Sequence, residues 1–403
     1  MNFGAPLLKT LLLMIIVAII VFAATYNYFT YTISTKTISV TVTSVSTTSI
    51  AIPSPITLTI PTTSTVVVPG SEVKYPITII DSAGRNVTFD KEPQRVVAIS
   101  STQVMVLLAL GVGDRIVGAS DTVIQDPLLM SLLPRKDIVN TGGFSSPSIE
   151  AILSAKPDLV IFYASFYRSV YDEIASKLPR DIKVVYFDLY KLDRVFDEIY
   201  KLGLIFNRVD RALNIISKWS SRLISVAAKT ADISSIDRVK VFFEGYTELA
   251  AAGPGSGWHQ ALTLAGGINI FGDVSQAYPK VSPEAVIERN PSVIIKVVSL
   301  TTYNPCKAVD TKTLESIYKT IVSRPGWSEI SAVKNNRVYV YSTAYLDGPG
   351  YVIQVALLAK LFYPQQFKDL DVKQWIYDWL IDMGLKEPWN TCKVSWIYPD
   401  ALR

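Results

Sequence analysis

The longest regular alternation of apolar and polar positions lies between residues 209 and 229. Apolar side chains recur there every three or four residues, the spacing of a helix with one buried face. They are Val209, Leu213, Ile216, Leu223 and Ala227. No Gly or Pro interrupts the chain between Gly203 and Gly245, so the pattern predicts one continuous helix. A helix of about twenty residues spans about 30 Å, the width of a small domain.

Two related motifs flank this helix. In residues 150–161 and again in residues 284–295, a Glu is followed seven positions later by a Pro and then by an apolar run. A Pro at that place ends a helix, and the apolar run that follows it is typical of a buried strand. We therefore expect two similar α/β lobes joined by a single stiff helix.

The remaining pattern alternates strands and helices along residues 75–383. Strands are predicted at residues 75–80, 86–89, 95–100, 116–119, 158–163, 183–187, 239–244, 293–298 and 337–341. Helices are predicted at residues 102–110, 148–155, 169–177, 194–206, 258–264, 283–289, 313–322, 352–362 and 372–383. Such alternation indicates parallel sheets, with ligands bound beyond the carboxyl ends of the strands.

The first 74 residues have a different composition. Residues 1–31 contain an uncharged apolar run at 11–24, which we interpret as an uncleaved membrane anchor, with a cleaved signal peptide as the alternative. Residues 32–74 are rich in Ser and Thr and are expected to form an extended stalk, although their Thr and Ile alternation would also suit a strand. The predicted domains that follow are a lobe at 75–208, the linking helix at 209–230 and a second lobe at 231–403.

Composition excludes several functions. The net charge is only +4, and the sequence contains no basic run, so nucleic acid is not expected as a partner. His259 is the only histidine, which excludes metal sites that need two imidazoles. We find no phosphate-binding loop, nucleophile elbow or Cys–His pair suited to catalysis. We expect neither an enzyme nor a resident cofactor or metal.

Several short stretches together resemble the substrate-binding proteins of ABC importers for iron–siderophore complexes, haem and cobalamin. They are residues 95–101, 110–118, 142–150, 264–269, 282–284, 324–339, 348–350 and 358–364. The resemblance implies a helical-backbone fold of two lobes, a permease and its ATPase subunit as partners, and a monomer on the outer face of the membrane. The anchor and stalk resemble the archaeal form. The family often has Arg where this chain has Gly350, so a role for that Arg does not carry over.

Glu150 and Glu284 match the glutamates with which the family docks on arginines of the permease. Acids at equivalent places on two lobes suit a partner with two-fold symmetry. The alternative is that each acid only complements its own helix dipole, an effect of about 0.3–1 kcal/mol.

Residues just beyond the predicted strand ends are expected to line a cleft between the lobes. They are Ser101, Thr102, Tyr163, Phe166, Tyr167, Tyr190, Tyr246, Tyr303, Tyr345 and Asp347. Tyrosine rings suit large flat ligands. The alternative is that several of these rings lie in the core, because the chain has 21 tyrosines.

The glycine-rich turn at residues 253–257 leads into Trp258 and His259. We interpret it as one wall of the cleft, as an anion-binding helix N-terminus, or as a haem site with His259 as the axial ligand. The alternative is a loop that binds no ligand. Cys306 and Cys392 are the only thiols. Outside the membrane they would form a disulfide that ties the C-terminal tail to the second lobe, with two unpaired buried thiols as the alternative.

The sequence therefore predicts capture of an iron chelate or corrinoid and its delivery to a permease. A haem protein, an oxyanion-binding protein such as one for molybdate, and a surface receptor without a transport role are the alternatives.

Overall fold

The computed structural model describes residues 32–34, 37–39 and 72–401 of the 403-residue chain. The chain divides into two compact units, Met1–Val73 and Lys74–Arg403. The predicted anchor and most of the predicted stalk lie outside the described residues. Within the stalk, β1 (Thr32–Ser34) and β2 (Thr37–Ser39) form an antiparallel pair, so the strand alternative holds there. Among the described residues, no helix is both long and apolar enough to cross a membrane.

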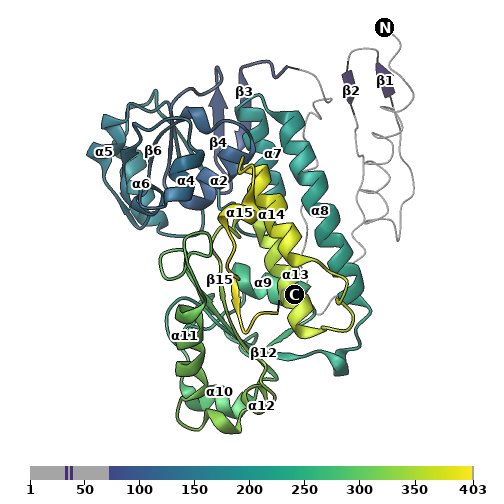
Figure 1. Ribbon diagram of the computed structural model, residues 1–403. Helices are drawn as coiled ribbons and strands as arrows, with labels where there is room; N and C mark the ends of the chain where they lie inside the picture. The colour runs from purple at the N-terminus through teal and green to yellow at the C-terminus, as the bar shows by residue number, and fades with distance from the viewer. Residues whose placement is uncertain (1–31, 35–36, 40–71, 402–403) are drawn as a thin grey trace. The chain divides into compact units, whose positions relative to one another are not determined.

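The N-terminal lobe is built on a five-stranded parallel sheet (Figure 1). In chain order the strands are β5 (Val96–Ala98), β6 (Ile116–Ala119), β7 (Val139–Asn140), β10 (Leu159–Phe162) and β11 (Lys183–Tyr186). Across the sheet the order is β11-β10-β5-β6-β7. The three central strands are buried along their whole length, because helices cover parallel sheets on both faces.

Helices connect these strands, and two small hairpins accompany them. The helices are α2 (Ser101–Ala109), α3 (Asp121–Ile124), α4 (Pro127–Leu132), α5 (Ile149–Ser154), α6 (Arg168–Lys177) and α7 (Val195–Ile205), with a 3-10 turn η1 (Gly113–Arg115). The hairpins pair β3 (Ile77–Ile80) with β4 (Asn86–Phe89), and β8 (Gly142–Gly143) with β9 (Ser146–Pro147).

The C-terminal lobe carries a second five-stranded sheet in the order β13-β12-β14-β15-β16. Its strands are β12 (Lys240–Glu244), β13 (Ile268–Asn269), β14 (Val293–Val298), β15 (Val338–Ser342) and β16 (Ile397–Tyr398). Four are parallel, and β16, from the C-terminal tail, pairs antiparallel with β15. The helices are α9 (Gly257–Leu264), α10 (Pro283–Arg289), α11 (Lys312–Val322), α12 (Ser331–Lys334) and α15 (Pro388–Thr391), with 3-10 turns η2 (Ser235–Asp237) and η3 (Trp327–Glu329).

The linking helix is α8 (Val209–Ala231), 23 residues long. Its buried face differs from the predicted stripe, because Leu213, Ile216 and Ala227 are only partly buried. The face is instead centred on Trp219, which is fully buried. Trp219 donates a hydrogen bond from Nε1 to Oδ2 of Asp382 at 2.9 Å, and this large side chain sets the rotation of the helix.

The joint between the lobes is a layer of helices rather than α8 alone. Helices α13 (Tyr351–Phe362) and α14 (Val372–Asp382) follow the 3-10 turn η4 (Gly348–Gly350), and α13 packs against α8, α9 and α14 (Figure 1). Lys218 and Arg222 of α8 form ion pairs with Asp382 and Asp378 of α14. The prediction of a single joining helix was therefore incomplete.

One hydrophobic core runs through both sheets and this helical layer. A second, smaller core lies in the C-terminal lobe around Phe242 and Trp327. A disulfide joins Cys306 to Cys392, which lie 86 positions apart in the sequence. It holds the C-terminal tail against the lobe that carries β14 and β15.

We predict that Trp219→Ala lowers the free energy of unfolding by about 3–5 kcal/mol, the usual cost of removing a buried Trp. The ring also packs edge-on against Trp379 at a centroid distance of 5.9 Å, so both the packing and the bond to Asp382 are lost. Urea denaturation measures the change. Ile236→Ala is the control, because Ile236 is 89% exposed and should change stability by no more than about 0.5 kcal/mol. Equal effects of the two substitutions would contradict this account of the joint.

Candidate functional site

A continuous group of aromatic side chains lies where the two lobes meet, and we call it the aromatic cluster. Its N-lobe members are Phe144, Tyr163, Phe166, Tyr167 and Tyr190, and its other members are Tyr246, Trp258, Tyr278 and Tyr351. The rings of Phe166 and Tyr278 cross between the lobes with centroids 5.9 Å apart. Tyr190 and Tyr351 make a second crossing at 6.1 Å.

Strand ends position these rings. Tyr163 follows β10, Tyr190 lies four residues beyond β11 and Tyr246 lies two residues beyond β12, as expected for parallel sheets. Asp188 fixes the loop that carries Phe166, since its Oδ1 accepts hydrogen bonds from the backbone N–H groups of residues 164 and 165 at 3.0 and 2.9 Å. The same oxygen accepts the Ser165 hydroxyl at 2.8 Å.

The cluster has a buried base and an exposed rim. Tyr246 is 51% exposed, Tyr167 46% and Tyr278 37%, whereas Tyr163 is only 9% exposed. Burial raises the pKa of Tyr163 and of Tyr278 to about 12. These phenols therefore stay neutral near pH 7 and keep their O–H donors. The exposed rings offer apolar faces with polar edges to a bound molecule.

Asp347 lies beside the cluster at the end of the loop after β15. Its Oδ2 accepts a hydrogen bond from the Thr102 hydroxyl at 3.1 Å, and this bond links the two lobes. The Tyr163 hydroxyl lies 3.5 Å from the same Thr102 oxygen. Burial raises the pKa of the Asp347 carboxyl to about 6, so the group is ionised at neutral pH in a poorly solvated place.

A second polar link between the lobes involves Asp126, Tyr345 and Asn304. The Tyr345 hydroxyl donates to Oδ2 of Asp126 at 2.8 Å, and Nδ2 of Asn304 donates to the same oxygen at 3.0 Å. Burial raises the pKa of Asp126. A cavity of about 350 Å³ at this link is lined by residues between 122 and 127, by residues between 300 and 308 and by Thr313.

The structure brings most of the predicted cleft residues together. Thr102, Tyr163, Tyr167, Tyr190, Tyr246 and Trp258 belong to the aromatic cluster or touch it. Ser101 is the partly exposed first residue of α2, and Tyr345 belongs to the second polar link. The predicted set lacks Phe144, Tyr278 and Tyr351. Phe144 follows the two-residue hairpin strand β8, which was not predicted, and Tyr278 lies in the long loop between β13 and α10.

Tyr303 and His259 lie apart from the aromatic cluster. Tyr303 is 4% exposed within the smaller core of the C-terminal lobe, and its hydroxyl donates to the Ser395 carbonyl at 3.0 Å. The ring of His259 turns toward β13, where its Nδ1 lies 3.0 Å from Nδ2 of Asn269. Burial lowers the pKa of His259, so its ring is neutral near pH 7. The adjacent Trp258 faces the cluster instead.

The glycine-rich turn supports the cluster from behind. A Cβ at Gly257 would lie 2.7 Å from the Tyr351 hydroxyl and 3.1 Å from the Tyr190 ring. Only glycine allows the first turn of α9 to approach these rings so closely. Ser256 caps the helix by accepting the backbone N–H of His259 at 3.1 Å, so the turn is tightly packed and ordered by hydrogen bonds.

Glu150 and Glu284 occupy equivalent exposed places on the two lobes. Each lies in the first turn of a short helix, α5 or α10, whose N-cap is a serine. Ser148 also donates its hydroxyl to Oε2 of Glu150 at 2.9 Å. The backbone N–H of Glu150 and the Ser148 hydroxyl lower the pKa of this carboxyl.

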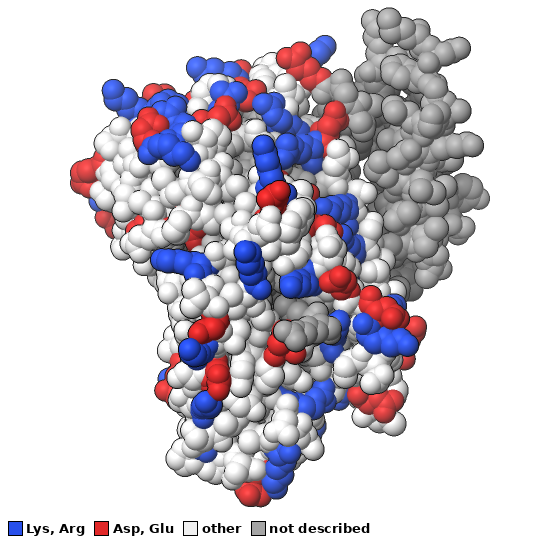
Figure 2. Space-filling view, viewed as in Figure 1, with Lys and Arg blue, Asp and Glu red and all other residues white. Residues whose placement is uncertain are grey.

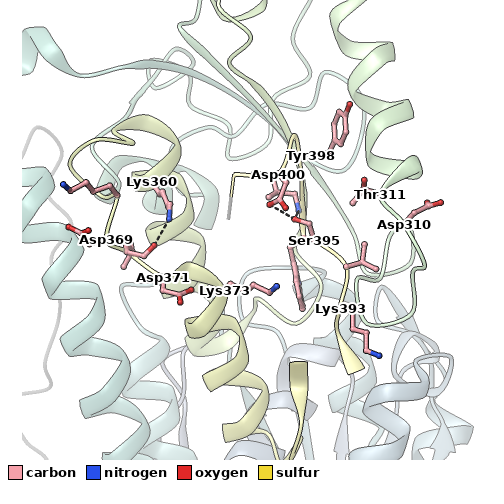
Figure 3. A pocket seen from close by; sticks show the side chains of 15 residues that line it. Asp310, Thr311, Lys360, Asp369, Asp371, Lys373, Lys393, Ser395, Tyr398 and Asp400 are labelled. Atoms are coloured by element: carbon pink, nitrogen blue, oxygen red, sulfur yellow. Dashed lines mark hydrogen bonds between the residues drawn. The ribbon is translucent and has the colours of Figure 1, made fainter. Parts of the chain in front are cut away.

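A surface cavity of about 770 Å³ lies in the C-terminal part of the chain, and its lining includes none of the aromatic cluster (Figure 3). Its lining mixes signs, with Lys360, Lys373 and Lys393 facing acids such as Asp310 and Asp371. Basic and acidic side chains are also interspersed on the face of the molecule in Figure 2. Among the described residues, no group of three or more His, Cys, Asp or Glu side chains is arranged to hold a metal ion.

We predict that the wild-type protein loses stability relative to Asp347→Asn as the pH rises from about 4 to about 6. The pKa of about 6 in the folded protein exceeds the value of about 3.9 in the unfolded chain. The contribution of this carboxyl group to the free energy of unfolding is therefore fully present below pH 4 and is lost as the pH rises through 6. Above pH 7 the variant should be more stable by about 1–2 kcal/mol, after allowance for partial solvation. Urea denaturation across this pH range measures the difference.

The control for this prediction is Asp137→Asn, which removes an exposed acid paired with Arg135. It should not reproduce the gain above pH 7. Parallel stability curves for the wild type and Asp347→Asn would show that Asp347 is not destabilised by its surroundings.

Comparisons with known proteins agree with this architecture. Residues 96–345 match the model of the periplasmic binding protein family. The uncharacterized ABC transporter substrate-binding lipoprotein YvrC of Bacillus subtilis is 26% identical over 301 residues, which cover 73% of this chain and 88% of the relative. A cobalamin-binding protein of Halobacterium salinarum is 27% identical over 231 residues, covering 56% of this chain and 59% of the relative.

Solved structures show the same fold. The TroA-like periplasmic binding protein FepB of Veillonella parvula aligns with a TM-score of 0.62 at 23% identity, over 76% of this chain and 96% of that one. The molybdate-binding protein MolA of Haemophilus influenzae aligns with a TM-score of 0.60 at 21% identity, over 76% and 97%. With two α/β lobes, a linking helix and a match that spans all three, this chain belongs to the periplasmic binding protein family.

Proposed function

We propose that this protein is the substrate-binding component of an ABC importer and that its cargo is a large, flat metal chelate, first of all a corrinoid. The observation that carries the proposal is the aromatic cluster at the junction of the lobes. Rings from both lobes meet there, and four of them, Phe144, Tyr167, Tyr246 and Tyr278, are more than a third exposed. A molecule held between the lobes would contact these faces from two sides.

The chemistry of the cluster suits such a cargo. Aromatic faces stack on extended rings and bury a large apolar area at little cost in conformational entropy. Neutral phenol groups such as that of Tyr163 add hydrogen-bond donors at fixed places. The cobalamin-binding relative supports a corrinoid as the cargo. Because a structural neighbour binds molybdate, an oxyanion is included among the ligands to be tested. No covalent step is needed, because the protein captures its ligand and releases it unchanged.

The linking layer of helices supports limited closure of the lobes. Helix α8 packs along α13, which in turn contacts α9 and α14, so large hinge movement would break a continuous core. In this mechanism the lobes shift slightly around the cargo, and the rim residues Tyr167 and Tyr246 complete its enclosure. The loaded protein then docks on a permease whose ATPase subunit supplies the energy for transport.

Glu150 and Glu284 are the proposed docking residues. Both are exposed at the start of a helix, one on each lobe, so together they form a bipartite acidic contact. A serine N-cap fixes the first turn that carries each acid. Basic side chains of a permease would pair with them, while the helix-dipole role of each acid remains compatible with docking.

The placement in the cell is also proposed. The apolar run at residues 11–24 would anchor the chain, and the Ser- and Thr-rich segment would hold a monomeric binding unit outside the membrane. The disulfide between Cys306 and Cys392 supports an oxidising compartment.

We expect saturable quenching of intrinsic fluorescence by one member of a panel of cyanocobalamin, haemin, ferric hydroxamates, ferric catecholates and molybdate, with cyanocobalamin as the first candidate. Tyr246→Ala should weaken binding of that ligand about 10-fold, because one stacking face worth about 1–1.5 kcal/mol is removed. Tyr318→Ala is the control, since Tyr318 packs against Tyr398, away from the cluster. Equal loss in both variants, or quenching by molybdate alone, would contradict the proposal.

Charge reversal of the docking residues should separate transport from binding. Glu150→Lys combined with Glu284→Lys is expected to abolish uptake of the identified ligand by cells while its affinity in solution stays unchanged. The matched control reverses two other exposed acids, Glu173 and Glu329, one on each lobe, and should leave uptake intact. A loss of affinity in the first variant would instead place these acids in the binding site.

A further inference from the structure

Among the described acids around the lobe junction, Asp188 and Glu244 form ion pairs, whereas Asp126 and Asp347 form none; Asp126 instead accepts hydrogen bonds from Tyr345 and Asn304. Asp188 forms an ion pair with Arg194 at 3.3 Å. Glu244 is held by Arg324 at 2.7 Å and by Lys296 at 3.2 Å. None of the ion pairs within residues 72–401 includes Asp347. A carboxylate in a poorly solvated place without a cation costs stability, and such a group points to a functional role.

The usual structural role of an Asp at this place is also absent. Asp347 is the residue before η4, yet its side chain accepts no capping hydrogen bond from that turn. The carboxylate extends instead to Thr102 of the other lobe at 3.1 Å. Only Oδ2 is used there, and Oδ1 is not among the buried atoms that lack a partner. Asp347 is partly exposed, and Oδ1 is the carboxylate oxygen left for a bound molecule.

The charge of this carboxylate acts on tyrosines from both lobes. After burial, the negative charge of Asp347 is a further cause that raises the pKa of Tyr163, Tyr246, Tyr341 and Tyr351. Tyr163 comes from the N-terminal lobe, and the others from the C-terminal part of the chain. Aromatic faces carry negative potential, and together with a carboxylate they attract cations and N–H donors.

Basic groups near the cluster do not cancel this charge. Lys296 is engaged by Glu244 and by backbone carbonyls. Lys191 lies at the edge, with Nζ 5.9 Å from the centroid of the Tyr190 ring. The other rings of the cluster have no Lys or Arg stacked on them among the described residues. Asp347 therefore lies beside the aromatic cluster without an ion-paired cation among the described residues.

We propose that Asp347 contacts the cargo directly and selects molecules that present N–H donors or positive charge, while it rejects anions. This inference rests on the proposed function and narrows it. A corrinoid with a periphery of primary carboxamides satisfies Oδ1 with an amide N–H. An oxyanion, or a chelate with several negative charges, meets both the carboxylate and the ring faces with repulsion.

The test compares two corrinoids that share ring, metal and axial ligands but differ in peripheral charge. Dicyanocobinamide carries carboxamides, and dicyanocobyrinic acid carries carboxylates. The full chain should bind the amide form more tightly. In Asp347→Asn the ratio of the two affinities should fall by about 10- to 100-fold, the loss expected for one charge-assisted hydrogen bond together with relief of repulsion. Calorimetric titration at pH 7.5 measures both constants.

The control variants separate contact from folding. Asp137→Asn removes the same charge from the exposed surface and should leave the ratio unchanged. Thr102→Val removes the partner of Asp347 but keeps its charge, so it should preserve discrimination against the carboxylate form. Urea denaturation verifies that each variant is folded. An unchanged ratio in Asp347→Asn, in a folded protein that binds cobinamide, would overturn the inference while leaving the proposed function in place.

A second probe pair covers failure of the corrinoid proposal. If neither corrinoid binds, the same variants are titrated with ferrioxamine B, a cationic ferric chelate, and with ferric enterobactin, an anionic one. Preference for the cation that disappears in Asp347→Asn would support the role of Asp347 and overturn the corrinoid assignment. Binding of molybdate or of the anionic chelate alone would overturn both.

Discussion

The packing of Trp219 between α8 and α14 is the contact on which the rest of the structure depends. Its ring meets Trp379 edge-on and its Nε1 binds Asp382, so the linking helix is fixed in rotation against the C-terminal helices. Through α13 the same core reaches both sheets. A continuous packed core therefore joins the two lobes beside the strand ends that carry the site.

This rigidity makes a particular kind of binding possible. Preorganised aromatic faces gain affinity because few side chains must be ordered when a ligand arrives. Phe166 and Tyr278 already touch across the junction, and Thr102 already binds Asp347. The junction thus combines aromatic rings from both lobes with the carboxylate of Asp347, which has no ion-paired cation among the described residues. In the proposed mechanism, the charge of this carboxylate provides selectivity and the area of the rings provides affinity.

Much of the architecture follows from local patterns in the sequence. The apolar periodicity predicted α8 within two residues of its observed end, and the two Glu-to-Pro motifs correspond to the equivalent helices α5 and α10 and the buried strands that follow each of them. The positions just after strands were also informative, because parallel strands must present their carboxyl ends at one edge. This rule found Tyr163, Tyr190 and Tyr246. It placed Tyr303 in the same group, although that ring packs in the C-terminal lobe's smaller core.

The sequence by itself determined the alternation of strands and helices, the length of the linking helix and the absence of a site built from several histidines, because each depends on residue type and spacing alone. Tertiary structure decided the rest. The buried face of α8 depends on the distant Asp382, and the C-terminal helices join the linking layer through contacts of α13 and α14 with α8, between residues that lie more than a hundred positions apart in the sequence. Tyr278 enters the cluster from a loop. Asp347 forms its hydrogen bond with Thr102, 245 positions away in the sequence. No local pattern encodes a contact between residues so far apart.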